Sequence, residues 1–142
     1  MLLHSNYCPP PNKKIARYAA SLYGRIHECQ IVTRKNVCID NWQPRPNQCH
    51  ANSMILETFG EGYTAVHGWF FLDFEGTRDF VRFIAHSVVM TAEGQLLDIT
   101  PNRSDVASYP FIAANLNDLE YENILDSLLR KYGTTECLDY RP

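Results

Sequence analysis

Long hydrophobic runs are absent from this sequence, and so is a large net charge. No apolar stretch approaches the roughly 20 residues that are needed to span a bilayer. The first residues, MLLHSNYCPPPNKK, lack the basic start and the longer apolar segment of a secretory signal. The formal net charge of −3 argues against a broad surface for nucleic acid. We therefore expect neither a membrane nor a nucleic acid as a partner.

Paired cysteines are also missing. The chain has five cysteines, an odd number, and none of them falls in a C-x-x-C pair. They are Cys8, Cys29, Cys38, Cys49 and Cys137. Free thiols in a reducing compartment are the simplest interpretation, so we expect a cytoplasmic protein. Export by a route without a cleaved signal is left open.

The length and composition of the chain are typical of one globular domain. A chain of 142 residues with 45% hydrophobic and 20% charged residues is ordinary for a soluble protein. A domain of this size buries about two thirds of its unfolded surface, which is enough for a core without metals or disulfides. We find no internal repeat. Residues 1–142 are therefore predicted to form a single catalytic domain with its motifs at about 42–101.

Apolar spacing of the helical kind predicts helices over residues 13–26, 49–59 and 118–132. Asn12 can cap the first helix, and Gly133 suits the end of the last one. The apolar residues of the middle helix are Ala51, Ile55, Leu56 and Phe59. Each predicted helix therefore has one apolar side to pack against another layer.

Aromatic and β-branched residues dominate the segments 63–74 and 79–91, and residues 95–100 follow a tight AEG break. These three segments are predicted to form antiparallel strands. Residues 31–40 are predicted to form a short strand or a loop. The expected fold class is α+β, with the cysteine-bearing helix packed on an antiparallel sheet between N- and C-terminal helices.

Cys49 lies where the middle helix begins, directly after a segment that Pro44 and Pro46 hold extended. A helix N-terminus favours a thiolate through its positive dipole and free N–H groups. Cysteines are also among the most often buried residues, so the placement alone favours an inert core residue over a nucleophile. His50 adjoins it but points about 100° away around the helix, which predicts a poor partner.

His86 and Asp98 lie on two strands that are predicted to form a hairpin. If residues 92–94 make a three-residue loop, Thr91 faces Gln95. His86 and Asp98 then become diagonal neighbours on one face, roughly 7–8 Å apart at their Cα atoms. A two-residue loop would place Asp98 on the opposite face. The pair therefore requires one specific register.

Three further residues are candidates for the same site. Gln43 precedes Cys49 by six residues, and its side-chain amide could donate to an oxyanion beside the Cys49 N–H. The alternative is a solvated loop glutamine. His67 and Trp69 could line an acyl pocket, and the alternative for this aromatic run is the core of a strand.

Gln43, Cys49, His86 and Asp98, in this order, resemble the papain-like group of cysteine enzymes. The segment AHSVVMTAEGQLLDITP (85–101) is similar to the transglutaminase-like and arylamine N-acetyltransferase branch, in which a His strand, a glycine turn and an Asp strand follow one another. The resemblance covers about residues 42–101. It implies Cys49 as the nucleophile, His86 as the base, Asp98 as its orienting group and Gln43 as the oxyanion donor.

This resemblance implies a thiol hydrolase or transferase that acts on an amide of a peptide or a protein side chain, without a cofactor. Deamidase, amidase and small-peptidase activities share this machinery. The chain departs from the papain pattern at PNQCHAN and has Asp98 where papain-like peptidases have asparagine. Two alternatives remain. One is a non-catalytic protein-binding module. The other is a zinc site of Cys49, His50, His67 and His86, but the sequence has no second cysteine at the spacing of a metal ligand, which argues against it. The sequence does not indicate an oligomeric state.

Overall fold

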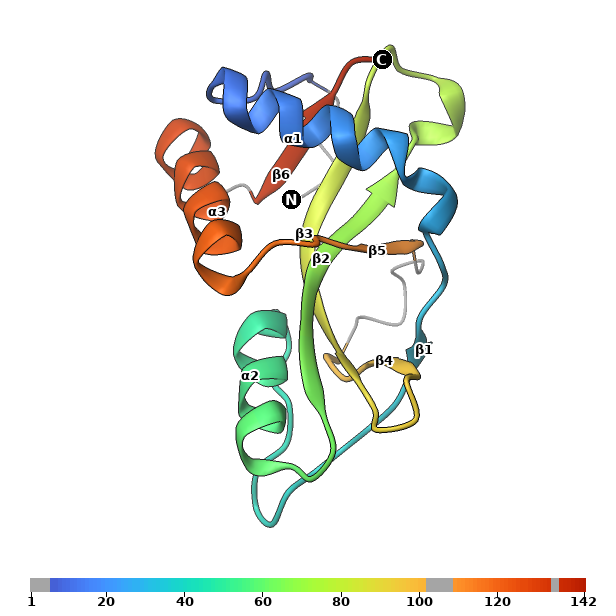
Figure 1. Ribbon diagram of the computed structural model, residues 1–142, viewed down its shortest axis with the longest axis vertical. Coiled ribbons are helices and arrows are strands. Elements are labelled where there is room, and N and C mark those ends of the chain that lie inside the picture. The colour runs from blue at the N-terminus through green and yellow to red at the C-terminus, as the bar shows by residue number, and fades with distance from the viewer. Residues whose placement is uncertain (1–5, 102–108, 134–135) are drawn as a thin grey trace.

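The computed structural model describes residues 6–101, 109–133 and 136–142, which contain three α-helices (Figure 1). They are α1 (Lys13–Gly24), α2 (Cys49–Phe59) and α3 (Asp118–Tyr132). Two single-turn 3₁₀ helices, η1 (Ile26–Glu28) and η2 (Phe74–Gly76), accompany them. No helix in these ranges has the length and apolar character that would let it cross a membrane.

A mixed sheet of six strands is the other component. The strands are β1 (Thr33–Arg34), β2 (Thr64–Leu72), β3 (Val81–Met90), β4 (Leu96–Asp98), β5 (Phe111–Ala113) and β6 (Cys137–Tyr140). Their order is β1-β4-β3-β2-β5, and β6 pairs with β3. The α+β class is confirmed. The expectation of a purely antiparallel sheet is wrong, because β1 runs parallel to β4.

Local hydrogen bonds account for the helix ends. The Asn12 side chain accepts a hydrogen bond from the Ile15 N–H and caps α1. Asn117 and Glu120 form a reciprocal capping box on α3, and Gly133 ends that helix with a positive φ of 83°. The first helix is shorter than predicted, because the chain tightens into η1 after Gly24.

The hairpin of β3 and β4 has the register that the three-residue loop predicts. Val89 pairs with Leu97 and Met90 with Leu96, and the Thr91 N–H bonds to the Gln95 carbonyl. Gly94 has a φ of 85°, a conformation that side-chain-bearing residues rarely adopt. His86 and Asp98 are therefore on the same face of the sheet.

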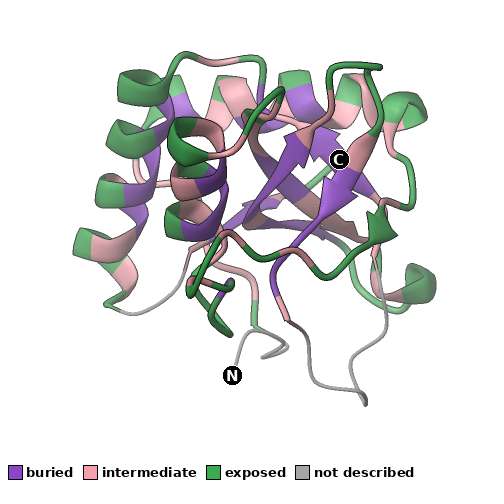
Figure 2. Cartoon of the chain, turned by 90° about the horizontal axis from the view of Figure 1, so that it is seen from below, coloured by how far each residue is buried: buried purple, intermediate pink, exposed green. Residues whose placement is uncertain are grey.

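The helices cover the face of the sheet that carries Trp69, Phe83 and Leu138. These residues pack with α1 and α3 in the main hydrophobic cluster, and Leu56 of α2 packs with Val89 in a second one. In each helix the buried residues lie on the side toward the strands (Figure 2). The amphipathic helix faces thus account for the layered arrangement.

In the described part of the chain, no strand pairs with the outer edge of β3 over residues 85–88. On the side away from β2, β6 pairs with Val81–Ile84 and β4 pairs with Val89–Met90. His86 lies between these two paired stretches. Because consecutive strand residues point to opposite faces, His86 and Ser87 present their side chains to different sides of the sheet at this edge.

The inward side of α2 is more polar than its apolar residues predicted. Asn52, Ser53 and Leu56 are buried, whereas Ala51 and Phe59 are exposed. The apolar face expected for this helix is therefore only partly right. The cause lies in the tertiary structure, because the first turn of α2 covers a network of buried polar side chains.

Ser53 offers a test of this packing. Its side chain is fully buried, and its hydroxyl makes no hydrogen bond with the described part of the chain. Ser53→Ala removes an unsatisfied polar group and adds helix propensity, so we expect a gain of about 1 kcal/mol in the free energy of unfolding. Urea denaturation measures it, and a loss of stability would mean that the hydroxyl has a partner.

Candidate active site

Cys49 is the first residue of α2, and its thiol is half-buried. Gln48, which precedes the helix, makes no side-chain cap. Within the described residues, the backbone N–H groups of residues 49–51 have no hydrogen-bond acceptor, as expected for the first turn of an uncapped helix. The sulfur therefore lies at a positive helix end with free donors.

Asn52 ties this helix start to the strand that carries Asp98. Its side-chain amide bonds to both the N–H and the carbonyl of Arg45, and it donates to the Thr100 hydroxyl over 3.0 Å. The Thr100 N–H in turn donates to Asp98 Oδ1. Because Asn52 is only 2% exposed, these bonds are shielded from water and hold the two elements in register.

His86 is held from three sides. Its Nε2 is 3.0 Å from Asp98 Oδ2, and the imidazole is 6% exposed. Phe70 stacks on the ring with centroids 4.1 Å apart, and Phe111 meets it edge-on. Gly68 pairs with His86, and a Cβ at Gly68 would lie 2.5 Å from the Phe111 ring. The contact with Asp98 occupies Nε2, so Nδ1 is the nitrogen of His86 that remains for the Cys49 sulfur.

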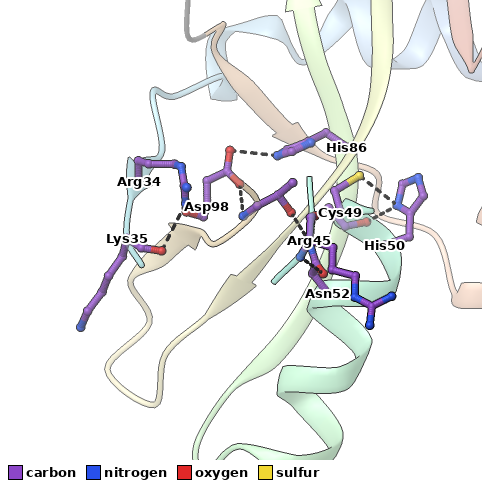
Figure 3. Close-up of polar contacts among 10 residues, drawn as sticks. Arg34, Lys35, Arg45, Cys49, His50, Asn52, His86 and Asp98 are labelled. Atoms are coloured by element: carbon purple, nitrogen blue, oxygen red, sulfur yellow. Dashed lines mark hydrogen bonds and ion pairs between the residues drawn. The ribbon is translucent and has the colours of Figure 1, made fainter. Parts of the chain in front are cut away.

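The structure brings Cys49, His86 and Asp98 together, with the imidazole between the sulfur and the carboxylate (Figure 3). Burial opposes ionisation of the thiol, yet hydrogen bonds to His50 and His86, and their positive charge, lower the pKa of Cys49 to about 6. Burial likewise disfavours the His86 imidazolium, but Asp98 and Cys49 raise the pKa of His86 to about 9. Both shifts favour a thiolate–imidazolium pair.

His50 corrects the sequence interpretation. Its Nδ1 lies 3.8 Å from the Cys49 sulfur, and its Nε2 lies 3.1 Å from Glu136 Oε2. Burial lowers the tendency of this ring to be charged, but its hydrogen bonds with Cys49 and Glu136 raise the pKa of His50 to about 10. Helical spacing predicted a poor partner because it describes where the two Cα–Cβ bonds point. It does not describe how far a long side chain can turn back.

The other predicted residues have different positions. Gln43 is exposed, and its side chain makes no hydrogen bond to any described residue. Trp69 has no exposed surface, and its indole N–H donates to Tyr18 in the main core. A substrate-lining role for Trp69 is therefore wrong, and the core alternative holds. His67 is partly buried and bonds to Ser87, which also contacts His50.

Other kinds of site are less well supported. In the ranges that the structure describes, no three His, Cys, Asp or Glu side chains are arranged to hold a metal ion. An open groove of about 460 Å³ lies along the C-terminal half of α2, lined by residues that include Trp42, Ile55 and Phe59. The groove does not include Cys49, so the polar cluster and the apolar groove are separate features.

Comparison with known proteins leaves the site to be interpreted from its own geometry. No protein-family model matches the chain, and no curated protein and no solved structure matches it.

Proposed function

We propose that this protein is a cysteine-dependent acyl-transfer enzyme that hydrolyses an amide through a thioacyl-enzyme. We place it in the papain-like fold group, nearest to the transglutaminase-like branch. The observation that carries the proposal is the meeting of the Cys49 thiol, the His86 imidazole and the Asp98 carboxylate at the start of a helix. An inert cysteine needs neither a free helix end nor a buried His–Asp pair beside it.

The first half of the reaction forms the thioester. The Cys49 thiolate attacks the carbonyl carbon, a C–S bond forms, and the carbonyl electron pair moves to oxygen. The Cys49 N–H, with Gln43 if its loop turns inward on substrate binding, donates to this oxyanion. His86 then gives its proton to the leaving nitrogen, and the C–N bond breaks.

The second half returns the enzyme to its starting state. Water loses a proton to His86 Nδ1 and attacks the thioester, and the C–S bond breaks to release the acid. Asp98 accepts a hydrogen bond from Nε2 throughout, and this keeps Nδ1 directed at the sulfur. Ammonia leaves if the substrate is a glutamine or asparagine side chain, and an amine leaves if it is a peptide. We favour a side-chain or short-peptide amide as the substrate.

The pH dependence of thiol alkylation tests the proposal. With a thiol pKa of about 6, roughly nine tenths of Cys49 is thiolate at pH 7, so its reaction with iodoacetamide should be half-maximal near pH 6 and level above pH 7. The Cys49→Ala variant should lack the alkylation that is half-maximal near pH 6. Cys29→Ala is the matched control, since burial raises the pKa of that thiol.

Ammonia release from glutamine-containing peptides then separates deamidation from peptide cleavage. A Cys49 profile centred near pH 8.5, like that of an ordinary cysteine, would contradict the enzymatic proposal and favour a protein-binding module instead.

A further inference from the structure

A chain of hydrogen bonds runs from the neighbour of the nucleophile toward the surface. His50 Nδ1 is 2.6 Å from the Ser87 hydroxyl, and the same hydroxyl is 2.6 Å from His67 Nδ1. His67 Nε2 lies 3.4 Å from the carboxylate of Asp118, a side chain that is 65% exposed. Glu136 bonds to the other nitrogen of His50. The chain links β3, β2 and α3 to the first turn of α2.

The positions of the protons in this chain follow from the number of donors. A serine hydroxyl has one proton, so it can donate to one of the two Nδ1 atoms and must accept from the other. Burial lowers the pKa of His67, so that ring is neutral and has one proton. The carboxylate of Asp118 draws this proton to Nε2, which leaves His67 Nδ1 as the acceptor. Ser87 therefore donates to His67 and accepts from His50.

His50 must then be doubly protonated. Its Nδ1 donates its one proton to Ser87 at 2.6 Å, with the Cys49 sulfur 3.8 Å from the same nitrogen as a weaker second acceptor. Its Nε2 faces the Glu136 carboxylate, which accepts only. The reverse assignment would make His50 neutral and turn the bare Nε2 of His67 toward the Asp118 carboxylate, which is electrostatically unfavourable. The network itself thus selects an imidazolium at position 50.

We propose that His50 is a second functional imidazole of the site, a fixed cation that holds Cys49 as thiolate while His86 alone moves protons. When sulfur is acylated its negative charge is lost, but the charge of His50 remains, because Glu136 and the Ser87–His67 chain hold both of its protons. The oxyanion forms on the carbon that is bonded to sulfur, so it also lies beside this cation. The role beside the oxyanion rests on the proposed function, whereas the role of holding the thiolate does not.

The groups around His50 favour this assignment from every side. Cys49 in α2 and Glu136 before β6 can supply negative charge, and Ser87 in β3 supplies an acceptor. The His67 ring in β2 and the Tyr121 ring in α3 lie edge-on to the His50 ring, with centroids 5.9 and 5.6 Å away, and neither is charged at neutral pH. Apart from burial, the groups that act on His50 are Cys49 and Glu136, and both favour its charged form.

Nitrogen-15 NMR of the histidine rings tests the fixed cation in the unmodified protein. We expect both ring nitrogens of His50 to be protonated at pH 7.5, whereas His67 has one proton on Nε2. A neutral His50 at this pH would overturn the proposal. Because this measurement needs no substrate, it stands even if no amide is ever found to be hydrolysed.

Alkylation of Cys49 tests the effect on the thiol. His50→Asn keeps a donor near the position of Nδ1 but removes the charge, and it should raise the thiol pKa by at least one unit, which lowers the alkylation rate at pH 6 several-fold. Ser87→Ala, which removes the acceptor of the chain, should shift the profile in the same direction by less. Ser53→Ala is the matched control, because it removes a fully buried serine hydroxyl that has no bond to the site.

Two results would contradict the proposal. An unchanged thiol profile in His50→Asn would show that His86 alone stabilises the thiolate. An unchanged proton count on His50 in Ser87→Ala would show that the chain through His67 does not hold the charge. If the profile shifts as expected but no amide is cleaved, the electrostatic role of His50 stands and the proposed function fails.

Discussion

Amide turnover is expected to fall about 10³-fold in the His86→Asn variant, while Cys49 keeps part of its reactivity toward alkylating agents. General acid–base catalysis by a positioned side chain contributes on the order of 10²–10⁴-fold. His86 is the group that can both take the thiol proton and protonate the leaving nitrogen, and Asn can do neither. The residual thiolate would reflect His50, which remains beside the sulfur. Steady-state kinetics with a glutamine peptide, run with the alkylation profile, measure both effects.

Two comparisons make this result specific. Asp98→Asn should lower turnover in the same direction, because the carboxylate sets which nitrogen of His86 faces the sulfur. His27→Asn should change nothing, since that side chain is 76% exposed. Full activity in His86→Asn, or in Asp98→Ala, would remove these residues from the mechanism.

The largest expected loss of stability comes from Asp139→Asn. Asp139 and Arg82 form an ion pair with no exposed side-chain surface on either partner, through contacts of 2.7 and 2.8 Å. Asp139 also accepts the Cys8 N–H, and Arg82 donates to the Asn6 carbonyl, so the pair joins β3, β6 and the N-terminal segment. Removing one buried charge leaves the other uncompensated, which costs about 3–5 kcal/mol.

Urea denaturation measures this loss, and an exposed pair on the same protein supplies the control. Asp79 is 72% exposed and lies 3.1 Å from Arg141, which is half exposed. Asp79→Asn should change the free energy of unfolding by less than about 1 kcal/mol, because exposed ion pairs are screened by water. Equal effects of the two substitutions would mean that the Arg82–Asp139 pair is hydrated and contributes no more than a surface pair.

The parts of the fold that sequence reasoning placed correctly are those specified by near neighbours in the chain. The capping box at Asn117 and the start of α2 at Cys49 depend on residues within one helical turn. The His86–Asp98 register depends on a three-residue loop that Gly94 permits. Hydrogen bonds and dihedral angles act over these short separations, so the local sequence is sufficient to predict them.

The strands β5 and β6 were not predicted, and a physical reason accounts for this. They have three and four residues and are separated in sequence from their partner strands by other elements. Each is a strand only because β2 or β3 offers it an edge. No periodic signal of useful length exists in such segments. Their positions depend on the sheet having already formed.

In the candidate site, too, some features follow from the local sequence and others only from tertiary packing. Local spacing in the sequence predicted the cysteine at a helix start, and it predicted the His–Asp pair on the condition of a three-residue loop. The folded chain alone decided that Glu136, 86 residues from His50, and Ser87 would turn that imidazole toward the sulfur, and that Asn52 would join α2 to Thr100. Contacts between distant residues depend on how the layers pack, and helical or strand spacing carries no information about that packing.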